Sequence, residues 1–227
     1  VADETGTSYT PRPEDVDLTV TVQVTGTRTG YASETVTSEP TAPVAAAVLD
    51  GPVPTISGRP VVDRDLVADP GEWGEGVTLG YQWLVGGTPV AGATEQTYRP
   101  TAAAVGGTVT VEVTGTAEGF APATRTSEPT APVEKATLTA PRRPKVGGTP
   151  RVGRQLKAKP GDWGDGVTLR YRWFADGERI EGRTGQRLRL TKDERGARIK
   201  VRVVGTRPGY TTDRETSRLT KKVRPRR

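Results

Sequence analysis

The chain of 227 residues has no cysteine, no histidine and no methionine. Without Cys and His it offers no thiol nucleophile, no imidazole base, no Ser-His-Asp triad and no zinc, haem or iron–sulfur site of the usual kinds. No run of 18 apolar residues is present, so no transmembrane helix is predicted. The first four residues lack the basic and apolar regions of a signal peptide, and we expect a mature, trimmed or partial chain. These absences favour a protein without catalytic residues, cofactors or metals.

An internal repeat organises the chain. Residues 70–83 (PGEWGEGVTLGYQW) return as residues 160–173 (PGDWGDGVTLRYRW), an offset of 90 that continues to Ser127 and Ser217 without an insertion. A partial copy at the start has an offset of 89, because EPTAPV at 39–44 recurs at 128–133. Self-similarity at a fixed period is typical of tandem modules. We predict the back half of a repeat at 1–44, a complete repeat at 45–133 and a basic repeat at 134–227.

Apolar residues alternate with polar ones inside each repeat. Leu169, Tyr171 and Trp173 alternate with Thr168, Arg170 and Arg172, a period of two that indicates strands with one buried face. Gly- and Pro-containing turns separate about seven such segments in roughly 90 residues. This pattern predicts an all-β fold of tandem immunoglobulin-like antiparallel β-sandwiches without disulfides.

The motif around the paired tryptophans resembles a known family. Trp83 and Trp173 each lie on the third predicted strand and are followed by a G-x-x-(V/I)-x-V-x-V strand. This arrangement is similar to the bacterial immunoglobulin-like repeats of secreted and surface proteins of actinobacteria, which are often appended to hydrolases. The resemblance implies a spacer, an adhesive module or a wall-associated tail outside the cell. This chain departs from immunoglobulins in lacking the Cys pair, whose disulfide would contribute roughly 2–4 kcal/mol.

The first repeat poses a packing problem. Residues 1–44 supply only the counterparts of the last three strands (E, F and G), which leaves an apolar face without an opposing sheet. We expect either further sequence upstream or strands donated by another chain through β-augmentation. The Pro-rich segments 38–44 and 127–133 are interpreted as semi-rigid polyproline links between modules of a stalk.

Charge is distributed unevenly between the repeats. Residues 1–133 hold 17 acidic and six basic residues, a formal charge of −11, whereas residues 134–227 hold 10 acidic and 27 basic residues, a formal charge of +17. The alternation of inward and outward residues along the strands places five cations of the third repeat on the outer face of one sheet. A basic tail at 221–227, predicted to be disordered, follows. The candidate polyanion-binding residues are Arg170, Arg172, Arg198, Lys200, Arg202, Lys221, Lys222, Arg224, Arg226 and Arg227.

Such a surface attracts polyanions through Coulomb steering and counterion release. For an exported protein the partner would be an anionic cell-wall polymer or an acidic polysaccharide, and other surface proteins are further candidate partners. Two alternatives stay open: the cations only keep the chain soluble, or they attract the acidic repeats head to tail. Dedicated nucleic-acid recognition is not expected, because no aromatic residue is interleaved among the outward arginines to stack on bases.

Other candidate sites compete with structural roles. The carboxylate pairs Glu72/Glu75 and Asp162/Asp165 lie in Gly-rich turns, which offer too few ligands for calcium and no cleft for a glycosidase. Trp73, Trp163 and Tyr210 are possible carbohydrate-stacking residues, although the tryptophans are favoured as plugs at the open end of each sandwich.

Together these patterns favour a non-catalytic stalk of a secreted or surface bacterial protein whose last repeat associates with an anionic cell-wall polymer. The alternative is a carbohydrate-binding or spacer appendage of a larger secreted hydrolase.

Overall fold

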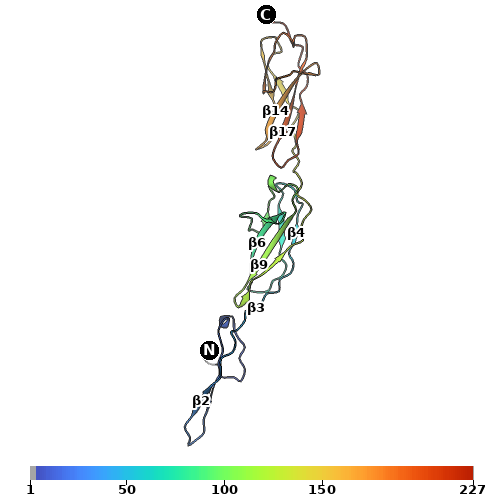
Figure 1. Cartoon of the computed structure of the whole chain (residues 1–227). Helices are drawn as coiled ribbons and strands as arrows, with labels where there is room; N and C mark the ends of the chain where they lie inside the picture. Colours follow the sequence, from blue (N-terminus) through green and yellow to red (C-terminus); the bar gives the residue numbers. More distant parts are fainter. Residues whose placement is uncertain (1–3, 227) are drawn as a thin grey trace. The chain divides into compact units, whose positions relative to one another are not determined.

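The computed structural model describes residues 4–226 and consists of β-strands with two short 3-10 turns (Figure 1). It divides into two compact units, one formed by 1–59, 65–98 and 107–131 and the other by 60–64, 99–106 and 132–227. The elements are, in chain order, η1 (Pro13–Asp15), β1 (Gln23–Gly26), β2 (Glu34–Thr37), β3 (Ala47–Val48), β4 (Thr55–Ser57), β5 (Leu66–Asp69), β6 (Thr78–Val85), β7 (Thr88–Pro89), β8 (Thr97–Tyr98), η2 (Ala102–Ala104), β9 (Val109–Thr116), β10 (Phe120–Ala121), β11 (Ala123–Thr126), β12 (Lys145–Gly147), β13 (Gln155–Lys159), β14 (Thr168–Ala175), β15 (Glu178–Arg179), β16 (Arg187–Arg189), β17 (Ile199–Thr206) and β18 (Asp213–Thr216).

The second and third repeats each form two antiparallel sheets. In the second repeat the sheets have the strand orders β11-β9-β6-β7 and β4-β5-β8, and in the third they have the orders β15-β14-β17-β18 and β12-β13-β16. Matched by the offset of 90, the two repeats have the same strand order. The residues opposite the strand tryptophans also match, since Trp83 pairs with Val111 and Trp173 with Val201. The prediction of disulfide-free, immunoglobulin-like β-sandwiches is therefore confirmed.

The strand tryptophans form the centre of each core. Trp83 and Trp173 are fully buried, and their indole N–H groups donate to the carbonyls of Glu95 at 2.8 Å and Gly185 at 2.9 Å. The ring of Tyr98 stacks on Trp83 with 5.5 Å between ring centroids. A buried indole needs a partner for its single donor, and both repeats supply a loop carbonyl. Packing of these side chains fills the place that an inter-sheet disulfide has in other sandwiches.

The first repeat, predicted to be a half-module, forms one two-stranded sheet among the described residues. Its β1 pairs with β2 in a two-stranded antiparallel sheet that corresponds to β9 and β11 of the second repeat. The core-facing side chains of β9 are fully buried, but their counterparts Val22 and Val24 are 56 % and 64 % exposed. The predicted absence of an opposing sheet accounts for this exposure.

The Pro-rich segments are not the semi-rigid polyproline links that the sequence suggested. In the second repeat the backbone N–H groups of Ser127 and Thr130 donate to the carbonyls of Val111 and Val109, each at 2.9 Å. The hydroxyls of the same serine and threonine accept hydrogen bonds at 3.0 Å from the N–H groups of those valines. This segment extends the edge of the sheet along β9, and its Ser and Thr side chains continue the backbone ladder. The interpretation as a polyproline spacer is therefore wrong for these residues.

The basic tail is ordered as far as Arg224, contrary to expectation. Val223 is 2 % exposed and belongs to the core cluster around Trp173. Its N–H donates to Ala197 O and its carbonyl accepts from Gly196 N–H, both at 2.9 Å. The same fold position holds Val133 in the second repeat, also 2 % exposed. The charges around Val223 in the sequence obscured its correspondence to a core residue.

Candidate anion-binding surface

The five cations predicted on one sheet lie on two adjacent strands of the third repeat. Arg170 and Arg172 belong to β14, Lys200 and Arg202 belong to β17, and Arg198 immediately precedes β17. Trp173 and Val201, which have the opposite parity on the same strands, are fully buried. We call these five cations the face cations. They lie together on the outer face of the sheet, as predicted.

Register brings like charges directly together on this face. Arg172 is the cross-strand partner of Arg202, and Phe174 is the partner of Lys200. Like charges in such positions destabilise a sheet. Within residues 4–226 none of the face cations forms a side-chain ion pair. The face therefore carries uncompensated positive charge.

An aromatic ring does lie among these cations, and the expectation that none would is wrong. Phe174 has the outward parity of Arg170 and Arg172 and is half-buried. The Nζ of Lys200 is 5.7 Å and the Cζ of Arg202 is 5.1 Å from its ring centroid, distances within the range of cation–π contacts. The ring holds two face cations against the sheet. Sequence analysis missed it because Phe174 directly follows the buried Trp173.

The positive charge extends beyond the predicted residues. Arg214 on β18 is exposed, and its cross-strand partner Val204 is an outward residue of β17. The second sheet also has a basic outer face, where Lys145 pairs with Lys159 and Lys157 pairs with Arg187. Arg187 and Arg189 lie on this opposite sheet, as expected. The period-two pattern around Leu156 and Ala158 could have identified the two β13 lysines in advance.

The residues of the tail lie close to both sheets. The backbone of Lys222 pairs with Arg198, and that of Arg224 pairs with Arg151. Lys221, Lys222, Arg224 and Arg226 are all exposed. Arg227, the last of the predicted polyanion-binding residues, lies outside the described residues.

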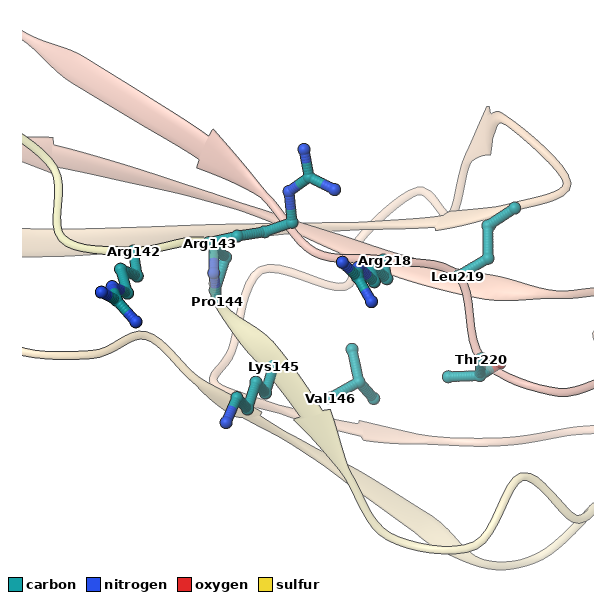
Figure 2. Close-up of a pocket in the computed structure, with 8 residues that line it drawn as sticks. All are labelled: Arg142, Arg143, Pro144, Lys145, Val146, Arg218, Leu219 and Thr220. Carbon is teal, nitrogen blue, oxygen red and sulfur yellow. The ribbon is translucent and has the colours of Figure 1, made fainter.

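A groove opens in the third repeat between the edges of its two sheets. It encloses about 640 Å³ and is lined on one side by residues 142–146, which lead into β12, and on the other by residues 218–220, which follow β18. Figure 2 shows the lining side chains of the two segments. Four of the lining residues are cationic, namely Arg142, Arg143, Lys145 and Arg218. We call these the groove cations. All four are exposed, and sequence analysis singled out none of them.

The aromatic candidates for sugar stacking occupy different environments. Trp73 and Trp163 are only 8 % and 7 % exposed, and each indole N–H donates to the carbonyl of the proline three residues earlier. Their burial matches the favoured role as plugs and leaves no free ring face for a sugar. Tyr210 is half-buried, its hydroxyl donates to Asp63 Oδ2 at 2.6 Å, and the guanidinium of Arg207 lies 4.3 Å from its ring centroid. The hydrogen bond to Asp63, followed by burial, raises the pKa of Tyr210.

The Gly-rich turn of the third repeat uses a carboxylate to bind the backbone of its own loop. Asp162 Oδ1 accepts a hydrogen bond at 2.9 Å from the N–H of Gly164, a short-range contact that stabilises the loop. Among residues 4–226 no three Asp, Glu, His or Cys side chains are grouped so that they could hold a metal ion. In the same part of the chain no helix is long and apolar enough to cross a membrane.

No family model and no curated protein matches the chain. Among solved structures, domains A168–A170 of titin are 15 % identical, with 91 % of this chain and 75 % of that chain covered and a TM-score of 0.29. The FN1–FN3 domains of chicken CNTN1 are 12 % identical, with 87 % and 76 % covered and a TM-score of 0.27. The tandem Ig repeats of Dlar are 14 % identical, with 76 % and 98 % covered and a TM-score of 0.21. The assignment of the fold rests on the strand order and the buried tryptophans of the two sandwiches.

Proposed function

We propose that the chain is a non-catalytic stalk or adhesive segment of a secreted or surface bacterial protein. Its repeats at 1–44, 45–133 and 134–227 act as modules, and the third associates with an anionic polymer of the cell wall. The bacterial and extracellular setting is suggested by the resemblance of the tryptophan motif to immunoglobulin-like repeats of such proteins.

One observation carries the polyanion part of the proposal. The second repeat has Gly80, Gln82, Thr108, Thr110 and Glu112 at the positions of the five face cations. The two repeats share their strand order and their buried tryptophans, so the fold does not require positive charge at these positions. A dense cluster of unpaired cations costs repulsion energy, and a polyanion would remove that repulsion while releasing its own counterions.

The alternative, a carbohydrate-binding or spacer appendage of a secreted hydrolase, has less support. It relies on exposed aromatic rings, yet Trp73 and Trp163 are buried and the hydroxyl of Tyr210 is bound to Asp63. An uncharged sugar would also leave the face cations without a role.

The test compares the full chain with a variant in which the face cations are replaced by their second-repeat counterparts: R170G, R172Q, R198T, K200T and R202E. Binding to immobilised teichoic acid is measured over a range of salt concentrations. The unaltered chain should bind at low salt and lose affinity steeply as salt rises, and the variant should bind weakly with a shallower slope. Equal binding by both proteins, or binding that does not respond to salt, would overturn the proposal. Binding to an uncharged glucan is the control for sugar stacking.

A further inference from the structure

We infer that the groove lined by Arg142–Val146 and Arg218–Thr220 binds a short segment of a linear polyanion that has a carbon skeleton. The inference rests on the proposed function and deepens it, because it adds a defined subsite to the surface formed by the face cations. The anionic groups would meet the groove cations, and the uncharged part of the repeating unit would lie on Val146 and Leu219.

The groove cations are an addition to a scaffold that forms without them. At their positions the second repeat has Pro52, Val53, Thr55 and Glu128. The structural residues of the groove are kept, because Pro144, Val146 and Thr220 correspond to Pro54, Ile56 and Thr130. Thr130 and Thr220 even make the same hydrogen bonds, accepting from Val109 N–H and from Ile199 N–H at 3.0 Å. Four changes in charge at one location, with the framework unchanged, show that folding of the repeat does not require these cations.

The groove cations have no partner among the residues that the structure describes. Across residues 4–226 none of their side chains forms a hydrogen bond or an ion pair. Three of the four are arginines, whose planar guanidinium can bind a phosphate, sulfate or carboxylate through two parallel hydrogen bonds. Four such donors along two chain segments suit several anionic groups spaced along one polymer, better than a single small anion.

The apolar part of the lining argues for a ligand with carbon atoms. Leu219 is 51 % exposed, although a leucine gains free energy when it is covered, and Val146 is half-buried beside it. The volume of about 640 Å³ lies within the range of small-molecule pockets, which is enough for a few units of a polymer but not for a folded protein. A polyanion made only of phosphate would leave this apolar surface uncovered.

The groove also lies between two basic surfaces. Lys145 lines it and pairs with Lys159 on the outer face of one sheet, while Arg218 directly follows Ser217, whose N–H bonds to Val201 O at 2.9 Å at the edge of the other sheet. A polymer strand held in the groove would therefore continue onto cations at either end. Positive potential on both sides would steer the strand toward the subsite.

The test uses the full chain and a heparin hexasaccharide, a short sulfated and carboxylated oligomer. The groove variant is R142Q/R143Q/K145Q/R218Q, and a matched control, R170Q/R172Q/R198Q/K200Q, removes the same charge from the sheet face. We expect the groove variant to bind the hexasaccharide with an affinity lower by roughly tenfold or more, and the control to lose less. Chemical shifts of the Val146, Leu219 and Thr220 amides should move on titration of the unaltered chain. A linear polyphosphate with as many negative charges as the hexasaccharide, but no carbon skeleton, should bind more weakly than the hexasaccharide.

Failure of the groove as a subsite and failure of the proposed function would give different binding results. If the unaltered chain binds long heparin and teichoic acid but the two variants lose equal affinity for the hexasaccharide, the groove is no subsite and the proposed function stands. If no polyanion binds at all, both the inference and the proposed function are wrong. Binding of maltohexaose, an uncharged hexasaccharide, with the same affinity would overturn the role of the groove cations.

Discussion

The indole ring of Trp73 lies directly against Gly115. A Cβ atom built on this glycine would lie 2.4 Å from Cε3 of the ring, far inside van der Waals contact, and the third repeat has the same relationship between Trp163 and Gly205. The buried ring therefore leaves room only for glycine at this position of β9. Two residues that are distant in sequence form one packing contact, and both complete repeats contain it.

Replacing Gly115 with alanine should destabilise the second repeat by about 1–3 kcal/mol, because the added methyl group must displace a buried ring. Gly80→Ala is a matched control on the neighbouring strand, since its nearest atom, Thr114 O, is 3.9 Å from the new methyl. Denaturation followed through amide NMR signals measures both variants, with the third repeat as an internal reference. Equal stability of the two variants would contradict the proposed role of the glycine.

Residues 217–223, the counterpart of the Pro-rich segments in the third repeat, yield a second prediction, because they also belong to the edge of the sandwich. Ser217 is 6 % exposed, and its hydroxyl accepts a hydrogen bond at 3.0 Å from the buried N–H of Val201. Ser217→Ala leaves that N–H without a partner, so the third repeat should lose about 1–3 kcal/mol of stability. Thr206→Ala removes only an exposed contact of 3.4 Å to Thr168 O and should cost less than about 0.5 kcal/mol. If residues 217–223 did not belong to the sheet edge, both changes would be neutral.

The order found at the C-terminal end can be tested by truncation. A chain that ends at Lys222 loses Val223 from the core and should lose at least about 2 kcal/mol of stability in the third repeat. A chain that ends at Arg224 keeps both hydrogen bonds of Val223 and the bond from Arg224 N–H to Pro150 O at 3.0 Å. Its melting temperature should match that of the full chain. Identical melting of the two truncated chains would indicate a disordered tail.

The internal repeat explains why so much of the fold was predictable. Alternation around Trp83 and Trp173 fixed the strands and their buried faces, and the parity of Arg170 and Arg172 placed them outward. The errors arose where composition was given more weight than alignment. Val223 was assigned to a disordered tail because basic residues surround it, although the offset of 90 aligns it with the buried Val133. The prolines near Ser127 suggested a spacer, although Ser and Thr hydroxyls can substitute for backbone groups at a sheet edge.

The groove illustrates a different limit of sequence analysis. Arg142 and Arg218 are 76 positions apart in the sequence, and neither lies within a strand. Parity assigns a residue to a face of a sheet, but it gives no information about segments that flank the strands. Only the approach of the two sheet edges brings these cations to one cavity. Comparison of the second and third repeats position by position would have revealed the four changes in charge, but not their proximity.

The contact between Tyr210 and Asp63 predicts a response to alkaline pH. The hydrogen bond raises the pKa of Tyr210 above the ordinary 10.0, so the neutral phenol is favoured in the folded state. Its contribution to stability is present below pH 10 and is lost as the pH rises through the raised pKa. Asp63→Asn should lower the pKa of Tyr210, whereas Arg207→Gln should raise it further because the nearby guanidinium favours the phenolate. Ring NMR signals of Tyr210 report the titration, and a pKa unchanged by Asp63→Asn would contradict the contact.

The exposed edge of the half-module leads to the last prediction. Val22 directly precedes β1, and its backbone N–H and carbonyl both form hydrogen bonds with Ser38, on the side of β2. Because backbone groups alternate in direction along a strand, the N–H groups of Thr21, Gln23 and Thr25 point to the opposite side. In the second repeat the matching edge of β9 pairs with β6, with Trp83 opposite Val111. A front half of this repeat should therefore pair with β1 and cover its apolar face.

A polypeptide of residues 45–96, which contains β3 to β7, is added to the full chain to test this pairing. Hydrogen exchange at the amides of Thr21, Gln23 and Thr25 should slow markedly, and the methyl signals of Val22 and Val24 should shift. The same fragment with Trp83→Ser should protect these amides much less, because the tryptophan would cover the counterpart of Val111. Protection that is equal with both fragments, or confined to the second repeat, would show that the half-module does not accept strands in the register of the complete repeats. Slower exchange at Val22 alone would not count as support, since its N–H is already bonded to the hydroxyl of Ser38 at 3.1 Å.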